Sequence, residues 1–138
     1  MRGAKAYAKV GVESGILAAS PYQRIVMLFD SYQAAIRMAR LHMQAGDMAG
    51  KGKAITKAVN IVSRGLRGSL DKERGGEVAA NLDQLYDTVV RLLLRASLNN
   101  DEQALDVAAS LLENIGSAWR QIGPQVEGEV GDGAGAGD

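Results

Sequence analysis

Residues 20–47 read SPYQRIVMLFDSYQAAIRMARLHMQAGD, and this stretch decides the fold class. Ser20 is a favourable N-cap, Pro21 suits the first position of a helix, and Gln23 completes a capping box. Gly46 ends the predicted helix and Asp47 caps the next one. Between these ends, apolar side chains recur every three or four residues and therefore share one helical face. That face consists of Ile25, Leu28, Phe29, Tyr32, Ile36, Ala39 and Met43.

Three further segments repeat the helical period. The second predicted helix covers about 48–70, with a core stripe of Ile55, Val59, Val62, Leu66 and Leu70. Gly75-Gly76 breaks the chain, and the third helix carries Val78, Leu82, Leu85, Val89, Leu92 and Ala96. After a turn at Asn99-Asn100-Asp101, the fourth carries Leu105, Ala108, Leu112, Ile115, Trp119 and Ile122. Short loops favour antiparallel neighbours, so residues 20–123 are predicted to form an all-α, up-down four-helix bundle.

The two ends of the chain differ from this body. Residues 1–19 are apolar but interrupted by Gly11 and Gly15, so we predict a short segment that docks on the bundle. Residues 124–138 are acidic and rich in glycine, which predicts a disordered tail.

The composition excludes several classes of function. The 138 residues include no cysteine, so disulfides and thiolate metal sites are excluded. Signal-peptide and membrane-spanning patterns are lacking, which predicts a cytoplasmic protein without membrane insertion. His42, the single histidine, has no partner motif for a di-iron centre or for nucleophilic catalysis. We therefore predict that the protein is not an enzyme and has no catalytic, cofactor or metal site.

The charges are unevenly distributed although they sum to zero. Residues 1–76 contain 13 Lys/Arg and 5 Asp/Glu, whereas residues 77–138 contain 3 and 11. The favoured interpretation is that the two halves pack together, and the alternative is a field that orients a partner. The second helix also carries Lys51 and a basic face that could follow the phosphates of a nucleic acid; that face consists of Lys53, Lys57, Arg64 and Arg67. Few aromatics are available to stack on bases, so we predict a solvated face and no nucleic-acid binding.

Several helices carry more apolar residues than one core stripe requires. Gly65 and Gly68 stand in such a surplus line, where each costs about 1 kcal/mol relative to alanine. We interpret them as a shallow trench that another backbone approaches. Each surplus residue by itself is more simply a core residue, but flexible and small residues together suit an adaptable groove. The predicted partner-binding set is Tyr7, Val10, Ile16, Met27, Ala34, Met38, Ala54, Ala58, Ile61, Gly65, Tyr86, Val90 and Leu94.

An ordered series of short motifs resembles the FliS family of flagellin-export chaperones, over roughly residues 6–122. The first half of the series is Ala6-Tyr7, Val12-Glu13-Ser14-Gly15, Ala19-Ser20-Pro21, Met27-Leu28-Phe29-Asp30 and Gln44-Ala45-Gly46-Asp47. It continues with Ser69-Leu70-Asp71, Gly75-Gly76-Glu77, Asn81-Leu82, Leu85-Tyr86-Asp87, Leu98-Asn99-Asn100-Asp101 and Ala118-Trp119. Thr88-Val89, Ser97 and the acidic tail depart from the family pattern, and the first two bear on the fit of a client.

The resemblance implies a cytoplasmic helical bundle, without a cofactor, that binds the disordered C-terminal segment of flagellin. Such binding prevents premature filament assembly and helps to deliver flagellin to components of the flagellar export gate. The resemblance also implies that the N-terminal segment, with Tyr7, Val10 and Ile16, covers part of the client surface. The alternative function is a regulatory scaffold that binds an anti-sigma factor or another export regulator.

Overall fold

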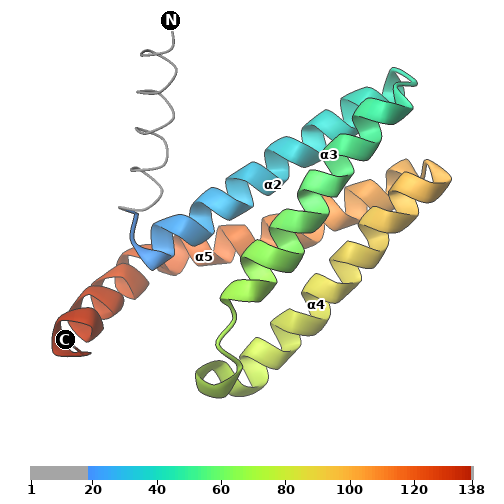
Figure 1. Cartoon of the computed structure of the whole chain (residues 1–138). Coiled ribbons are helices and arrows are strands. Elements are labelled where there is room, and N and C mark those ends of the chain that lie inside the picture. Colours follow the sequence, from blue (N-terminus) through green and yellow to red (C-terminus); the bar gives the residue numbers. More distant parts are fainter. Residues whose placement is uncertain (1–18, 138) are drawn as a thin grey trace, which may run out of the picture.

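A computed structural model describes the backbone of residues 19–137 and the side chains of residues 19–123. The described elements are α2 (Pro21–Gln44), α3 (Met48–Asn60), the π-helical turn η1 (Ile61–Leu66), the 3₁₀ turn η2 (Arg67–Ser69), α4 (Lys72–Asn99) and α5 (Glu102–Gly137). The four long helices alternate in direction, and each packs against the next in the cyclic order α2, α3, α4, α5 (Figure 1). The predicted all-α four-helix fold is confirmed. None of the described helices combines the length and the apolar character needed to cross a membrane.

Both ends of α2 and the start of α3 form as the sequence predicts, whereas the helix predicted over about 48–70 is α-helical only to Asn60 and continues as η1 and η2. At the start of α2, the Gln23 backbone N–H donates to Ser20 Oγ at 3.1 Å. In return, the Ser20 backbone N–H donates to Gln23 Oε1 at 3.0 Å, which completes the capping box. Gly46 ends α2 with a φ of 75°, and Asp47 Oδ1 accepts from the Gly50 N–H at 3.0 Å. Each of these contacts satisfies a backbone group that a helix end leaves unpaired.

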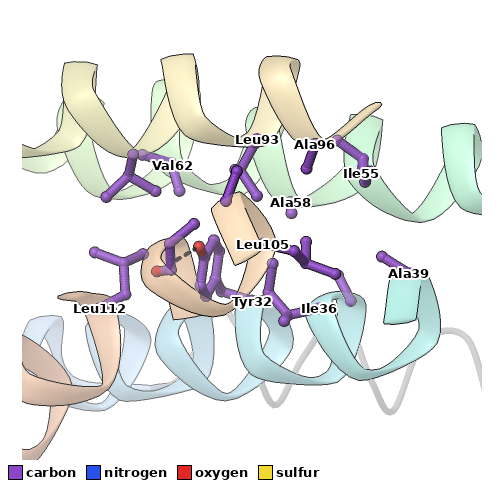
Figure 2. Close-up of a cluster of buried hydrophobic side chains, with 14 of the residues drawn as sticks. Tyr32, Ile36, Ala39, Ile55, Ala58, Val62, Leu93, Ala96, Leu105 and Leu112 are labelled. Atoms are coloured by element: carbon purple, nitrogen blue, oxygen red, sulfur yellow. Dashed lines mark hydrogen bonds between the residues drawn. The ribbon is translucent and has the colours of Figure 1, made fainter. Parts of the chain in front are cut away.

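The core is centred on a buried tyrosine. Figure 2 shows side chains from all four helices meeting around Tyr32, whose hydroxyl donates to the Ala108 carbonyl at 2.9 Å. Burial raises the pKa of Tyr32 well above its ordinary value. The same cluster contains Ile36 and Val62. Because Tyr32 lies on α2 and Ala108 on α5, this hydrogen bond sets the register of two helices that are distant in sequence.

The buried face of α4 differs from the predicted stripe. Val78 is 67% exposed, so its assignment to the core is wrong, and Ala79, Tyr86 and Leu93 are buried instead. Gly76 has a φ of 53° and a ψ of −127°, and this kink separates the first turn of α4 from the rest of the helix. The predicted break at Gly75-Gly76 is therefore present at Gly76. Val78 lies two residues after this kink, in a part of α4 whose other side chains are mostly exposed as well.

Ile122 is a second misassigned core residue, since its side chain is 45% exposed. It lies beside Gly123, where α5 passes the Tyr22 ring at the start of α2. From there α5 continues beyond the other helices to Gly137 (Figure 1). The predicted disorder of residues 124–138 remains a prediction.

Ion pairs join the basic and acidic halves of the chain, as the favoured interpretation of the charges predicts. Arg40 pairs with Asp106 at 2.6 Å, and Arg67 pairs with Asp83 at 2.6 Å. The hydrogen bond from Arg67 holds the pKa of the Asp83 carboxyl below its usual range. Because Arg67 is ion-paired, it is not a free member of a basic face.

Lys51 is also absent from that face. It is only 6% exposed, and its ammonium donates to the Ser97 carbonyl at 2.9 Å and to Asn100 Oδ1 at 3.2 Å. Asn100 has a φ of 52° and ends α4 in the left-handed conformation. Lys51 thus ties α3 to the turn between α4 and α5, because its three donors can satisfy several acceptors at one place.

Candidate functional site

The largest cavity described lies at one end of the seam between α2 and α3. It measures about 710 Å³ and opens between the first turns of α2 and the η1–η2 segment. Met27, Leu28 and Gly65 line its walls, while Tyr86 and Trp119 reach it from α4 and α5. The lining is therefore predominantly apolar, which suits the burial of apolar side chains from a ligand.

A second cavity of about 540 Å³ lies toward the other end of the same seam. Ala34 and Met38 line it from α2, and Ala54, Lys53 and Lys57 line it from α3. Because α2 and α3 run in opposite directions, the two cavities follow one another along the pair of helices. We call these two cavities together the α2–α3 groove.

The structure brings together part of the predicted partner-binding set. Those that line the α2–α3 groove are Met27, Ala34, Met38, Ala54, Gly65 and Tyr86. Met27 and Met38 are exposed, so flexible side chains are available at both ends of the groove. Tyr86 is a buried core residue that also contributes to the lining of the larger cavity.

Other members of the set lie elsewhere. Ala58 is fully buried in the core, where a small residue lets α3 pack closely, so it is not exposed to a partner in this structure. Ile61 and Val90 are half-buried against the core, and Leu94 is exposed on α4 outside both cavities. Tyr7, Val10 and Ile16 lie outside the described residues.

Gly65 lies in the π-helical turn η1, and its position is tightly packed. A Cβ built on Gly65 would lie 2.8 Å from Leu28 Cδ2, closer than two carbon atoms approach without displacement. A Cβ on Gly68 would meet nothing within 4 Å. The close neighbour of Gly65 is thus the Leu28 side chain and not another backbone, so the predicted approach of another backbone to Gly65 and Gly68 stays a prediction. π-helical turns occur frequently at functional sites.

The difference between the two glycines gives a stability prediction. We expect Gly68→Ala to raise the free energy of unfolding by about 0.5–1 kcal/mol, because alanine lowers the entropy of the unfolded chain and fits here without strain. Gly65→Ala should not give this gain, because its Cβ has to displace Leu28. Urea denaturation of both variants checks the prediction. Equal gains would mean that the Leu28 contact does not constrain Gly65.

Sequence reasoning missed the aromatic contact at the end of the groove. The rings of Tyr22 and Trp119 stack with centroids 5.8 Å apart and planes inclined by 22°. Both residues line the larger cavity. They are far apart in the chain, and no local pattern relates them, so only the packing of α5 against α2 brings them together.

His42 and Asp47 form a polar pair at the opposite end of the groove. His42 Nδ1 lies 3.0 Å from Asp47 Oδ2. The His42 side chain is half-buried, so it is less exposed than the predicted surface position implies. The hydrogen bond from the Gly50 N–H, with smaller contributions from His42 and Lys53, lowers the pKa of Asp47. Within residues 19–123, no three His, Cys, Asp or Glu side chains gather as metal ligands would.

The fold and the site together are those of a helical bundle with an open, largely apolar groove along one seam. The chain belongs to the FliS family, because the family model described as flagellar protein FliS matches residues 3–126. It is similar to the flagellar secretion chaperone FliS of Salmonella typhimurium, with 51% identity over 123 residues, 89% of this chain and 91% of the relative.

Two further relatives bear the same name. The flagellar secretion chaperone FliS of Escherichia coli is 44% identical over 120 residues, which cover 87% of this chain and 88% of the relative. That of Bacillus subtilis is 28% identical over 109 residues, 79% of this chain and 80% of the relative. All three relatives are named as flagellar secretion chaperones.

Proposed function

We propose that this protein is a cytoplasmic flagellar secretion chaperone that binds the disordered C-terminal segment of flagellin. The observation that carries the proposal is the apolar α2–α3 groove in a member of the FliS family. Apolar side chains of the client that would otherwise drive polymerisation are covered in the groove. The bound subunit is thereby kept unassembled until it is delivered to components of the export gate.

The shape of the groove fits a distributed contact better than a single deep anchor. Two cavities, of about 710 Å³ and 540 Å³, follow one another along α2 and α3. A disordered client loses several kcal/mol of the gross interaction energy when it becomes ordered on binding. Several moderate apolar contacts along a long segment offset this loss. Met27, Ala34, Met38, Ala54 and Gly65 are the proposed contacts.

We also propose that the N-terminal segment, residues 1–19, covers part of this surface in the absence of a client. A third cavity at the start of α2 supports the proposal, because Ala19 and Met27 both line it. Met27 also lines the larger cavity of the groove. The chain thus enters the bundle next to the client surface, and apolar surface that is covered in this way is protected from aggregation.

Calorimetric titration with a peptide from the C-terminal segment of the flagellin of the same organism tests the function. Saturable one-to-one binding, checked by size exclusion, is the expected result, and a peptide of the same composition in scrambled order is the control. If neither the full chain nor a variant without the N-terminal segment binds, the flagellin assignment is wrong. Titration with an anti-sigma factor then tests the alternative of a regulatory scaffold.

A further inference from the structure

Six lysine and arginine side chains within residues 19–123 have no ion pair and no side-chain hydrogen bond. They are Arg24, Arg37, Lys53, Lys57, Arg64 and Arg95. All six are exposed. Four of them line the α2–α3 groove: Arg24 and Arg64 at the larger cavity, and Lys53 and Lys57 at the smaller one. We call these four residues the cationic rim.

The carboxylates near the groove do not neutralise the rim. Among the side chains of residues 19–123, Asp47 is the only Asp or Glu that lines either of the two cavities, and it pairs with His42. Lys53 lies close enough to help lower the pKa of Asp47, but it forms no ion pair with it. Asp30, on α2, pairs with Arg120 of α5. By contrast, Arg67 is paired with Asp83 and Asp87 of α4.

The groove therefore combines an apolar floor with unpaired positive charge at both ends. An entirely apolar client would desolvate part of the rim without providing a partner for it, and that cost opposes binding. A client with carboxylates beside its apolar face would instead gain charge-assisted contacts. Such contacts at the rim of an interface act mainly on the association rate, on the salt dependence and on specificity.

We propose that the cationic rim selects acidic amphipathic segments, in which Asp or Glu side chains flank the apolar residues that enter the groove. This proposal rests on the proposed function of the groove as a client-binding site. The spacing of the rim supports this choice. Lys53 and Lys57 are four residues apart and share one face of α3, so they present two charges in a row along the groove. Arg24 lines the larger cavity from α2, and Arg64 lines it from η1.

Two charge-neutralised variants of the full chain test the proposal against a matched control. The first combines Lys53→Gln with Lys57→Gln, and the second combines Arg24→Gln with Arg64→Gln. The control combines Arg37→Gln with Arg95→Gln, which removes the same charge from exposed residues outside both cavities. Titration of each with the flagellin C-terminal peptide, at low and at high salt, measures the effect of the rim.

We expect each rim variant to bind the peptide roughly 3- to 10-fold more weakly than the wild type at low salt, as for one or two exposed ion pairs. The control should stay within about twofold, and high salt should reduce the differences because it screens exposed charges. A second peptide, with every Asp and Glu replaced by Asn and Gln, should bind the rim variants at least as tightly as the wild type, because the variants no longer desolvate an unpaired charge. If the wild type, both rim variants and the control all bind both peptides with the same affinity, the proposed selection by the rim is wrong. The proposed function would still stand, because flagellin binding itself would be intact.

Two other ligands could bind the cationic rim in place of an acidic client: the acidic tail of this chain and a single-stranded nucleic acid. Binding experiments with the same peptides distinguish them. In one variant, Glu127→Gln, Glu129→Gln and Asp132→Asn remove three charges of the acidic tail. If the uncharged peptide binds this variant more tightly than the wild type, the rim serves the tail of this chain, and the client assignment is overturned. A single-stranded oligonucleotide that displaces the acidic peptide at physiological salt would likewise overturn it.

Discussion

Replacing Leu93 by alanine is expected to lower the free energy of unfolding by about 3 kcal/mol. Leu93 is fully buried, and its side chain points from α4 into the cluster around Tyr32 (Figure 2). Truncation to alanine removes apolar contacts on the inner face of α4 and leaves a cavity. The surrounding helices can close that cavity only in part, because hydrogen bonds such as that between Tyr32 and Ala108 fix their register. Urea denaturation followed by circular dichroism measures the loss.

The neighbouring leucine provides the control. Leu94 is 48% exposed and has the same chemistry and helix propensity, so Leu94→Ala should cost less than about 1 kcal/mol. The two variants therefore separate burial from any general effect of the substitution. A loss at Leu94 that equals or exceeds the loss at Leu93 would show that α4 presents a different face to the core in solution.

Gly65→Leu is expected to weaken binding of the flagellin peptide by roughly 30-fold. A side chain added to a packed site costs about 1–3 kcal/mol, and a roughly 30-fold loss of affinity falls within that range. At Gly65, a Cβ atom already comes within 2.8 Å of Leu28, so a leucine has to displace that side chain or extend into the larger cavity. In either case it occupies space that the client requires. Calorimetric titration measures the affinity, and circular dichroism shows whether the helices are retained.

Gly52→Leu is the matched control for this variant. A Cβ on Gly52 would meet nothing within 4 Å, and Gly52 lines neither cavity of the groove. The control should therefore bind the peptide as the wild type does. Ile61→Asp is also expected to weaken binding, but it is a less specific test, because Ile61 packs against the core and its loss affects stability. Unchanged affinity of both Gly65→Leu and Ile61→Asp would remove the end of α3 and η1 from the client site.

Local rules were sufficient for both ends of α2 and for the start of α3, but not for the end of α3 at Asn60 or the start of α4 at Lys72. The capping box at Ser20 and Gln23, the left-handed Gly46 and the cap at Asp47 all form where the sequence predicts them. These features depend on residues within one or two turns of each other, so no distant part of the chain is needed to specify them. The buried stripe of α2 is predictable for the same reason, and Phe29, Tyr32, Ile36, Ala39 and Met43 are all in the core.

The candidate site was less predictable from periodicity. Met27 and Met38 were correctly placed beside the core stripe and are exposed at the groove, whereas Ala58 is buried. Periodicity shows that a residue lies near the apolar face of its helix. It does not show how far the neighbouring helix overlaps that face. For Ala58, the overlap of packed helices is complete.

The sequence by itself therefore determined four helical segments, the caps of α2 and the start of α3, the four-helix fold class and the resemblance to the FliS family. Tertiary structure alone decided which of two adjacent apolar residues is buried, as for Leu93 and Leu94, and which cations remain unpaired. It also placed Lys51 against Ser97 and Tyr22 against Trp119. The physical reason is the range of the interactions. Caps and helical periodicity act within a few residues, whereas burial and ion pairing depend on helices that meet only when the whole bundle has assembled.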